Sequence, residues 1–128
     1  MLDLYKLPVF SSLKPTQVEQ VLQAKESQVF QFQAASWHTP AQAYQDLAQR
    51  LQFAPDFGAN LDALADALAD LSERYQSGSR VVLLFSAFNA SDLYQTDWHV
   101  EFIAICEEAS SYWLEQDKYL QILVSEVA

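Results

Sequence analysis

An unbroken run of large apolar side chains is the feature of this sequence that most constrains its fold. Residues 81–85 read Val-Val-Leu-Leu-Phe and follow a short Ser-Gly-Ser-Arg stretch. A strand with one face in water alternates apolar and polar residues, whereas a strand covered on both faces is apolar throughout. The run therefore predicts the central strand of a parallel sheet, and it is far too short to span a bilayer.

Further strands and helices alternate around this run. β-favouring residues at 29–32 and 119–124 predict two more strands. Apolar residues at helical spacing predict helices over 40–51, from 60 to about 75, and over about 97–113. Thr39, followed by Pro40, and Asn60 suit the starts of the first two helices, and Pro55 with Gly58 places a turn between them. We therefore expect an α/β fold in which a small three-stranded parallel sheet is packed by helices.

The first 26 residues are predicted to be a separate extension of this domain. Residues 1–14 show no periodic pattern, and residues 15–25 predict a short helix with Val18, Val21 and Leu22 on one face. The domain itself is expected to span 27–128. The beginning of the chain has neither a basic segment nor a long apolar one, so we expect no secretory signal.

The single cysteine, Cys106, lies beside an apolar helical stripe and is predicted to be a buried small side chain. One cysteine cannot form an internal disulfide, which favours a reducing compartment, and we expect a cytoplasmic protein. His38 and His99 lack the neighbours of a metal or catalytic site, and the three tryptophans are expected to pack in the core.

Acidic residues outnumber basic ones by 17 to 7, which gives a formal net charge of −10. Nucleic-acid binding needs a surplus of Lys and Arg, so the balance argues against that class and favours a cationic partner. The charge is also unevenly placed. Residues 1–40 sum to zero, whereas residues 41–128 carry 4 basic and 14 acidic side chains. Segment 56–73 has five acidic residues and no Lys or Arg.

The helix predicted from Asn60 separates these acids from its apolar residues. At about 100° per residue, one stripe carries the apolar residues Leu61, Leu64, Leu68, Leu71 and Tyr75. The opposite stripe carries Asp62, Asp66, Asp70 and Glu73. Like charges one turn apart destabilise a helix by about 0.2–0.5 kcal/mol per pair. Alanines at 59, 63, 65, 67 and 69 leave a low surface around the carboxylates.

Two interpretations of this acidic stripe stay open on the pattern alone: a solvated face of a very acidic protein, and a surface that binds a cationic partner. A metal site is disfavoured because the carboxylates do not come from a loop of closely spaced oxygen ligands. A glycosidase pair is disfavoured because nothing marks a cleft. With only 2 glycines, a glycine-rich phosphate loop is excluded, and we expect no cofactor.

The segment Phe-Gly-Ala-Asn-Leu-Asp-Ala-Leu-Ala-Asp-Ala-Leu at 57–68, preceded by Pro55-Asp56, resembles the barstar family of intracellular ribonuclease inhibitors. It is similar to that family's G-x-N-L-D-A-L-x-D-x-L motif, in which an aromatic-glycine turn leads into a helix. The resemblance covers roughly residues 27–126 and includes the order of strands and helices. It implies a non-enzymatic protein that covers the active site of a small, basic, secreted ribonuclease.

The resemblance also assigns roles to residues of the motif. Asp66 is expected to enter the pocket for an RNA phosphate, with Asp62 pairing beside it. Phe57 matches the aromatic residue before the glycine and is expected to pack against a catalytic histidine. Gly58 is expected to permit the turn, and Asn60 to cap the helix. The resemblance therefore implies that the partner is a basic ribonuclease or another cationic toxin, and we expect no nucleic acid and no membrane as partners.

Three further acids complete the predicted partner-binding set. Glu108 resembles the family's acidic contact on the helix before the last strand, and Asp70 extends the stripe by one turn. Asp56 stands where the family's best-known inhibitor has an aromatic residue, and Ala65 replaces a large aromatic before the second aspartate. These departures mean less apolar anchoring and more charge.

Three other functions stay open: immunity against a toxin that is not a ribonuclease, a regulatory interaction module, and a carboxylate-based hydrolase. We expect a monomer.

Overall fold

The computed structural model describes residues 10–23 and 27–126. Four parallel strands form one sheet: β1 (Phe10–Leu13), β2 (Gln28–Gln33), β3 (Arg80–Ser86) and β4 (Tyr119–Ser125). Their order across the sheet is β1-β4-β3-β2, so the apolar run lies in β3 between two neighbours. The expected α/β fold, with its three parallel strands β2, β3 and β4, is confirmed.

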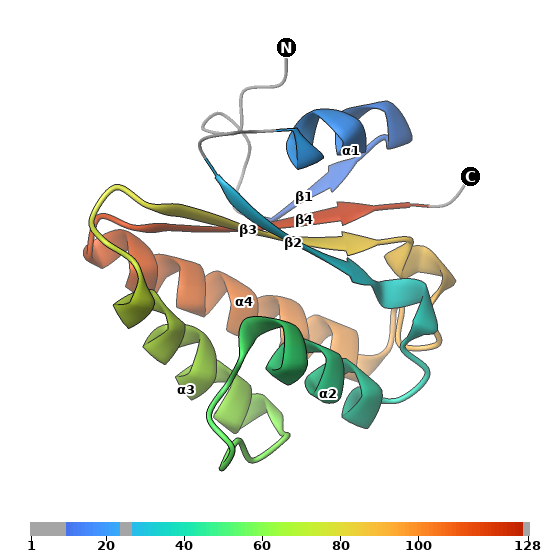
Figure 1. Cartoon of the computed structure of the whole chain (residues 1–128). Coiled ribbons are helices and arrows are strands. Elements are labelled where there is room, and N and C mark those ends of the chain that lie inside the picture. Colours follow the sequence, from blue (N-terminus) through green and yellow to red (C-terminus); the bar gives the residue numbers. More distant parts are fainter. Residues whose placement is uncertain (1–9, 24–26, 127–128) are drawn as a thin grey trace.

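The helices lie on the two faces of this sheet in unequal numbers. In Figure 1, α2 (Pro40–Leu51), α3 (Leu61–Leu71) and α4 (Asp97–Glu115) cover one face, and α1 (Pro15–Leu22) lies on the other. Short 3₁₀ turns follow several elements: η2 (Ala34–Ser36), η3 (Ser72–Arg74) and η4 (Phe88–Ala90). The predicted helix over 60–75 is thus α-helical to Leu71 and ends as the 3₁₀ turn η3.

Strand β1 is an element that the sequence did not indicate, because residues 1–14 were expected to be irregular. It pairs in parallel with β4, from Phe10 opposite Ile122 to Leu13 opposite Ser125. A strand of four residues is too short to show a period of its own, and here the edge of β4 supplies its hydrogen-bonding partners. Residues 1–9, and the last part of the helix predicted over 15–25, lie outside the described residues.

The apolar run of β3 contributes to two separate cores. Val81, Leu83 and Phe85 belong to the main core between the sheet and helices α2, α3 and α4. Val82 and Leu84 face the other way and form a smaller cluster under α1 with Leu13, Val21 and Leu123. Successive side chains of a strand point to opposite faces. The run is continuous because both faces are covered, and α1 covers the second one.

The two predicted helix caps are confirmed. The hydroxyl of Thr39 accepts a hydrogen bond from the backbone N–H of Gln42 at 3.3 Å, with Pro40 at the first helical position. The side-chain oxygen of Asn60 accepts from the backbone N–H of Ala63 at 2.8 Å. Each bond satisfies a donor that the first turn of a helix leaves unpaired. The starts of α2 and α3 are therefore encoded locally.

All three tryptophans pack as expected, and each indole N–H has an acceptor. Trp37 donates to Asp46 Oδ2 at 2.9 Å, and Trp113 donates to the backbone carbonyl of Leu68 at 2.8 Å. Cys106 is buried in the main core, where burial raises the pKa of its thiol. Among the described residues, no helix is long and apolar enough to cross a membrane.

Candidate functional site

The acidic stripe lies on the outer face of α3. Leu64, Leu68 and Leu71 are 0–2% exposed and fix the inner face of the helix in the main core. Four acids on the opposite face are exposed: Asp62, Asp66 and Asp70 on α3, and Glu73 just beyond it. A helix rises about 6 Å in four residues, so the three aspartates form a row about 12 Å long. We call Asp62, Asp66 and Asp70 the acidic row.

The residues that the structure describes do not neutralise this row. In the part of the chain that the structure describes, no Lys, Arg or His side chain forms an ion pair with any of its carboxylates. The two cations close to the end of α3 are engaged elsewhere. Arg74 donates to the backbone carbonyl of Leu51, and Lys118 donates to that of Ser72. The row therefore presents unpaired negative charge to solvent.

The turn before α3 is tight, and two small residues make it so. Ala59, with φ at 52°, adopts the left-handed conformation, whereas Gly58 has no positive φ. A Cβ atom on Gly58 would meet the Cβ of Ala63 at 3.3 Å, which is a close contact. Gly58 thus serves the turn by leaving space for the first turn of α3, and the left-handed residue is its neighbour Ala59.

Aromatic side chains tie this turn to the rest of the fold. The half-buried ring of Phe57 lies 5.0 Å from that of Phe53 and 6.3 Å from that of Tyr44, between ring centroids. Tyr44 is buried on α2, and its hydroxyl accepts a hydrogen bond from the indole N–H of Trp98 on α4 at 2.9 Å. Asp56 is exposed one residue before Phe57. The turn is therefore packed against α2, and Tyr44 joins α2 to α4.

Helix α4 lies alongside α3 and brings further side chains to the same region. Gln116 donates to the hydroxyl of Ser72 at 3.2 Å, and the indole of Trp113 reaches the carbonyl of Leu68. These contacts set the two helices parallel, with their C-terminal ends level. Glu108 is exposed on α4 about two turns before Gln116, so it lies level with the first half of α3.

The site region also contains an aromatic residue that the sequence analysis did not select. Tyr112, on α4, is 43% exposed, which is high for a large aromatic side chain. On the neighbouring helix α3, Ala65 and Ala69 are partly buried and lie between the leucine face and the acidic row. The sequence shows where Tyr112 lies around the axis of α4. It does not show which side of α4 packs against α3.

The two histidines make separate contacts in the described part of the chain. His38 contacts Asp92 at 2.8 Å on the surface, and the ring of His99 stacks on Phe88 with centroids 4.7 Å apart. Burial lowers the pKa of His99. Within residues 10–23 and 27–126, no three His, Cys, Asp or Glu side chains are grouped so that they could hold a metal ion.

A comparison with protein-family models matches residues 27–125 to the family described as barstar (barnase inhibitor). The chain belongs to the barstar family. Members of this family inhibit barnase-type ribonucleases and are not enzymes. The barstar match includes the turn, the acidic row and α4, and it begins after β1 and α1. A search of curated proteins found no match.

Proposed function

We propose that this barstar-family chain inhibits a small basic ribonuclease of the barnase type, barnase included, inside the cell that produces it. The start of α3 and the turn before it cover the active site of the enzyme. Asp66 occupies a phosphate pocket, Asp62 pairs with cations beside it, and Phe57 packs against a catalytic histidine. The observation that carries the proposal is the acidic row, exposed and unpaired on a helix whose other face is buried.

The unpaired state of the row favours binding to a cationic cleft. A carboxylate that is already paired must give up its own partner before it binds another cation. The carboxylates of Asp62 and Asp66 have no such internal ion pair to break among the described residues. A ribonuclease cleft holds arginine and lysine side chains that bind phosphates, and carboxylates supply similar acceptor oxygens. The net charge of −10 also steers a basic protein toward this chain.

The rigidity of the surface supports the same proposal. Binding is weaker when it must order loops and side chains, and a surface ordered in advance avoids that cost. Here Asn60 caps α3, three leucines bury its inner face, and Phe57 ties the turn to α2. The row is therefore positioned before any partner arrives.

RNA cleavage by barnase, titrated with the purified chain, tests the proposal. We expect cleavage to stop at a ratio near one to one. Asp66→Asn removes one charge from the row and should weaken inhibition at least tenfold, as expected for a buried charge contact. Glu19→Gln is the matched control, because it removes one exposed charge from α1, on the opposite face of the sheet. This control should inhibit like the unmodified chain.

Two results would contradict the proposal. The first is undiminished RNA cleavage at a large excess of the unmodified chain. The second is equal inhibition by the unmodified chain, Asp66→Asn and Asp62→Asn, which would exclude mimicry of phosphates by the row. Association should also slow as salt rises, because added ions screen long-range attraction between the two proteins.

A further inference from the structure

Tyr112 is the large exposed aromatic side chain of α4, the helix that packs beside α3 and its acidic row. Gln116, one helical turn later on the same side of α4, donates both to the carbonyl oxygen of Tyr112 and to the hydroxyl of Ser72 at the end of α3. Side chains four residues apart in a helix are neighbours. Tyr112 therefore lies on the side of α4 that borders α3, level with Leu68 and Ala69.

Small side chains form the surface of α3 that faces α4. Ala65 and Ala69 lie on the side of α3 that faces α4, as Ser72 does, and both are only partly buried. Their methyl groups are short, and the ring of Tyr112 stays 43% exposed on the neighbouring helix. Glu108 precedes Tyr112 by one turn and is also exposed. The ring thus lies on a helix that carries the Glu108 carboxylate one turn before it and packs beside α3, whose outer face carries the acidic row.

We propose that Tyr112 is an aromatic anchor on the α4 side of the interface and receives an arginine guanidinium of the basic partner; this inference rests on the proposed function. A guanidinium stacks on an aromatic face, and its remaining donors bind carboxylates in the same plane. Tyrosine and arginine are the residue types most enriched at the centres of interfaces. The ring supplies apolar contact area that the alanines of α3 do not.

The other exposed apolar side chains of α4 do not share this position. Leu114 is 57% exposed but lies two residues further along the helix, about 200° around its axis from Tyr112. Val100 is exposed near the opposite end of α4. Leu114 therefore offers a matched control: an apolar residue at the same end of the same helix that faces away from α3.

The test measures association and dissociation rates with barnase whose catalytic activity has been removed. We expect Tyr112→Ala to raise the dissociation rate about tenfold and leave the association rate nearly unchanged. Tyr112→Phe keeps the ring and should stay within about twofold of the unmodified chain. Leu114→Ala should do the same. Because the side chain is exposed, Tyr112→Ala should melt at nearly the temperature of the unmodified chain.

A further variant separates the guanidinium from simple apolar contact. Tyr112→Leu keeps apolar area but lacks a ring, so it should dissociate as fast as Tyr112→Ala. Dissociation at the original rate would overturn the stacking role. Unchanged binding by Tyr112→Ala, together with weakened binding by Asp66→Asn, would overturn this inference and leave the proposed function standing. If the unmodified chain does not bind barnase, both fail together.

Discussion

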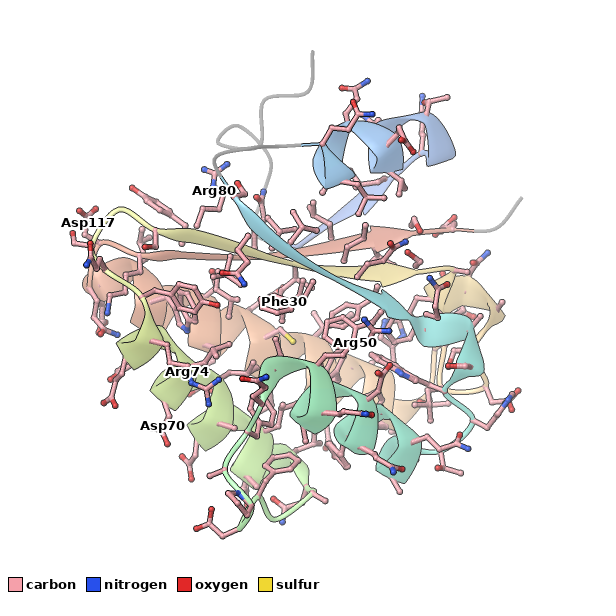
Figure 2. The ribbon with its side chains drawn as sticks, in the orientation of Figure 1. Phe30, Arg50, Asp70, Arg74, Arg80 and Asp117 are labelled. Atoms are coloured by element: carbon pink, nitrogen blue, oxygen red, sulfur yellow. The ribbon has the colours of Figure 1, made fainter. Side chains whose placement is uncertain are left out.

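Arg74, the cation that directly follows the acidic helix, donates a hydrogen bond from Nη1 to the backbone carbonyl oxygen of Leu51 at 2.6 Å. Its Nη2 donates to the carbonyl of Gln52, also at 2.6 Å. In Figure 2, the side chain of Arg74 extends toward α2, whereas Asp70 points outward from α3. Arg74 thereby satisfies carbonyls at the end of α2 and forms no ion pair with the acidic row.

This relationship predicts a large loss of stability when Arg74 is replaced. Arg74→Met leaves two carbonyl groups at the end of α2 without a charged donor and should lower the free energy of unfolding by about 1–2 kcal/mol. Arg50→Met is the control, since Arg50 pairs with the partly buried Asp46 within one helix and lies over the ring of Phe32 at 5.8 Å. It should cost less than Arg74→Met, about 1 kcal/mol or less. Urea unfolding measures both, and equal losses would contradict the assignment.

The acidic row should reduce the stability of the free protein. Asp66 lies one turn from both Asp62 and Asp70, and each like-charge pair destabilises a helix by about 0.2–0.5 kcal/mol. Asp66→Asn removes both repulsions at nearly equal helix propensity. We expect it to raise the free energy of unfolding by about 0.5 kcal/mol while it weakens inhibition. The gain should shrink in 1 M salt, where repulsion is screened. A loss of stability would show that Asp66 has an internal stabilising contact.

Substitution by glycine usually lowers the stability of a protein, but at the left-handed residue Ala59 we expect it to raise the stability. Ala59 has a φ of 52°, a conformation that glycine adopts without steric cost. Ala59→Gly should therefore stabilise the protein by about 0.5 kcal/mol, after the added flexibility of the unfolded chain is taken into account. Ala63→Gly, inside α3, should destabilise by about 0.5–1 kcal/mol. Thermal unfolding of both variants should move the midpoint in opposite directions.

The packing of α1 predicts that part of the segment 1–26 is integral to the fold. Val21 is fully buried against Val82, Leu84 and Leu123, whereas the neighbouring Leu22 is 41% exposed. Val21→Ala should lower the free energy of unfolding by about 2 kcal/mol through lost burial and a residual cavity. Leu22→Ala should cost well under 1 kcal/mol. Similar small effects for both would mean that α1 does not close the second core.

The burial of His99 predicts a loss of stability in mild acid. Its Nδ1 accepts a hydrogen bond from the backbone N–H of Gln95 at 2.8 Å, and burial lowers its pKa below the ordinary value of 6.5. As pH falls below 6.5, the unfolded chain binds a proton that the folded protein resists, so stability decreases. Above that pH, His99 is neutral in both the folded and the unfolded state, so it contributes nothing to the pH dependence of stability.

His99→Gln should flatten this part of the pH dependence. The comparison is the change in unfolding midpoint between pH 7.5 and pH 5.5 for the unmodified chain and for the variant. The variant should show the smaller decrease, since it lacks the titrating ring. An equal decrease in both proteins would mean that carboxylates, and not His99, cause the loss of stability in acid.

Features of short sequence range could be predicted well. The caps Thr39 and Asn60, the buried leucines of α3 and the outward acidic row follow from spacing within one helix. The strand at 81–85 followed from a run of apolar residues. The strand β1, the left-handed Ala59 and the site of Arg74 could not be predicted in this way. Each depends on a neighbour distant in sequence or on backbone geometry that several residue types can adopt.

The amino-acid sequence by itself determined which residues form helices and strands, and which face of α3 is acidic, because hydrophobic periodicity and capping act over a few residues. Only the tertiary structure decided that β1 joins the edge of β4, that Arg74 reaches α2 and that the Tyr112 side of α4 packs toward α3. Those relationships arise when elements pack, and packing depends on the summed shapes of side chains far apart in the chain.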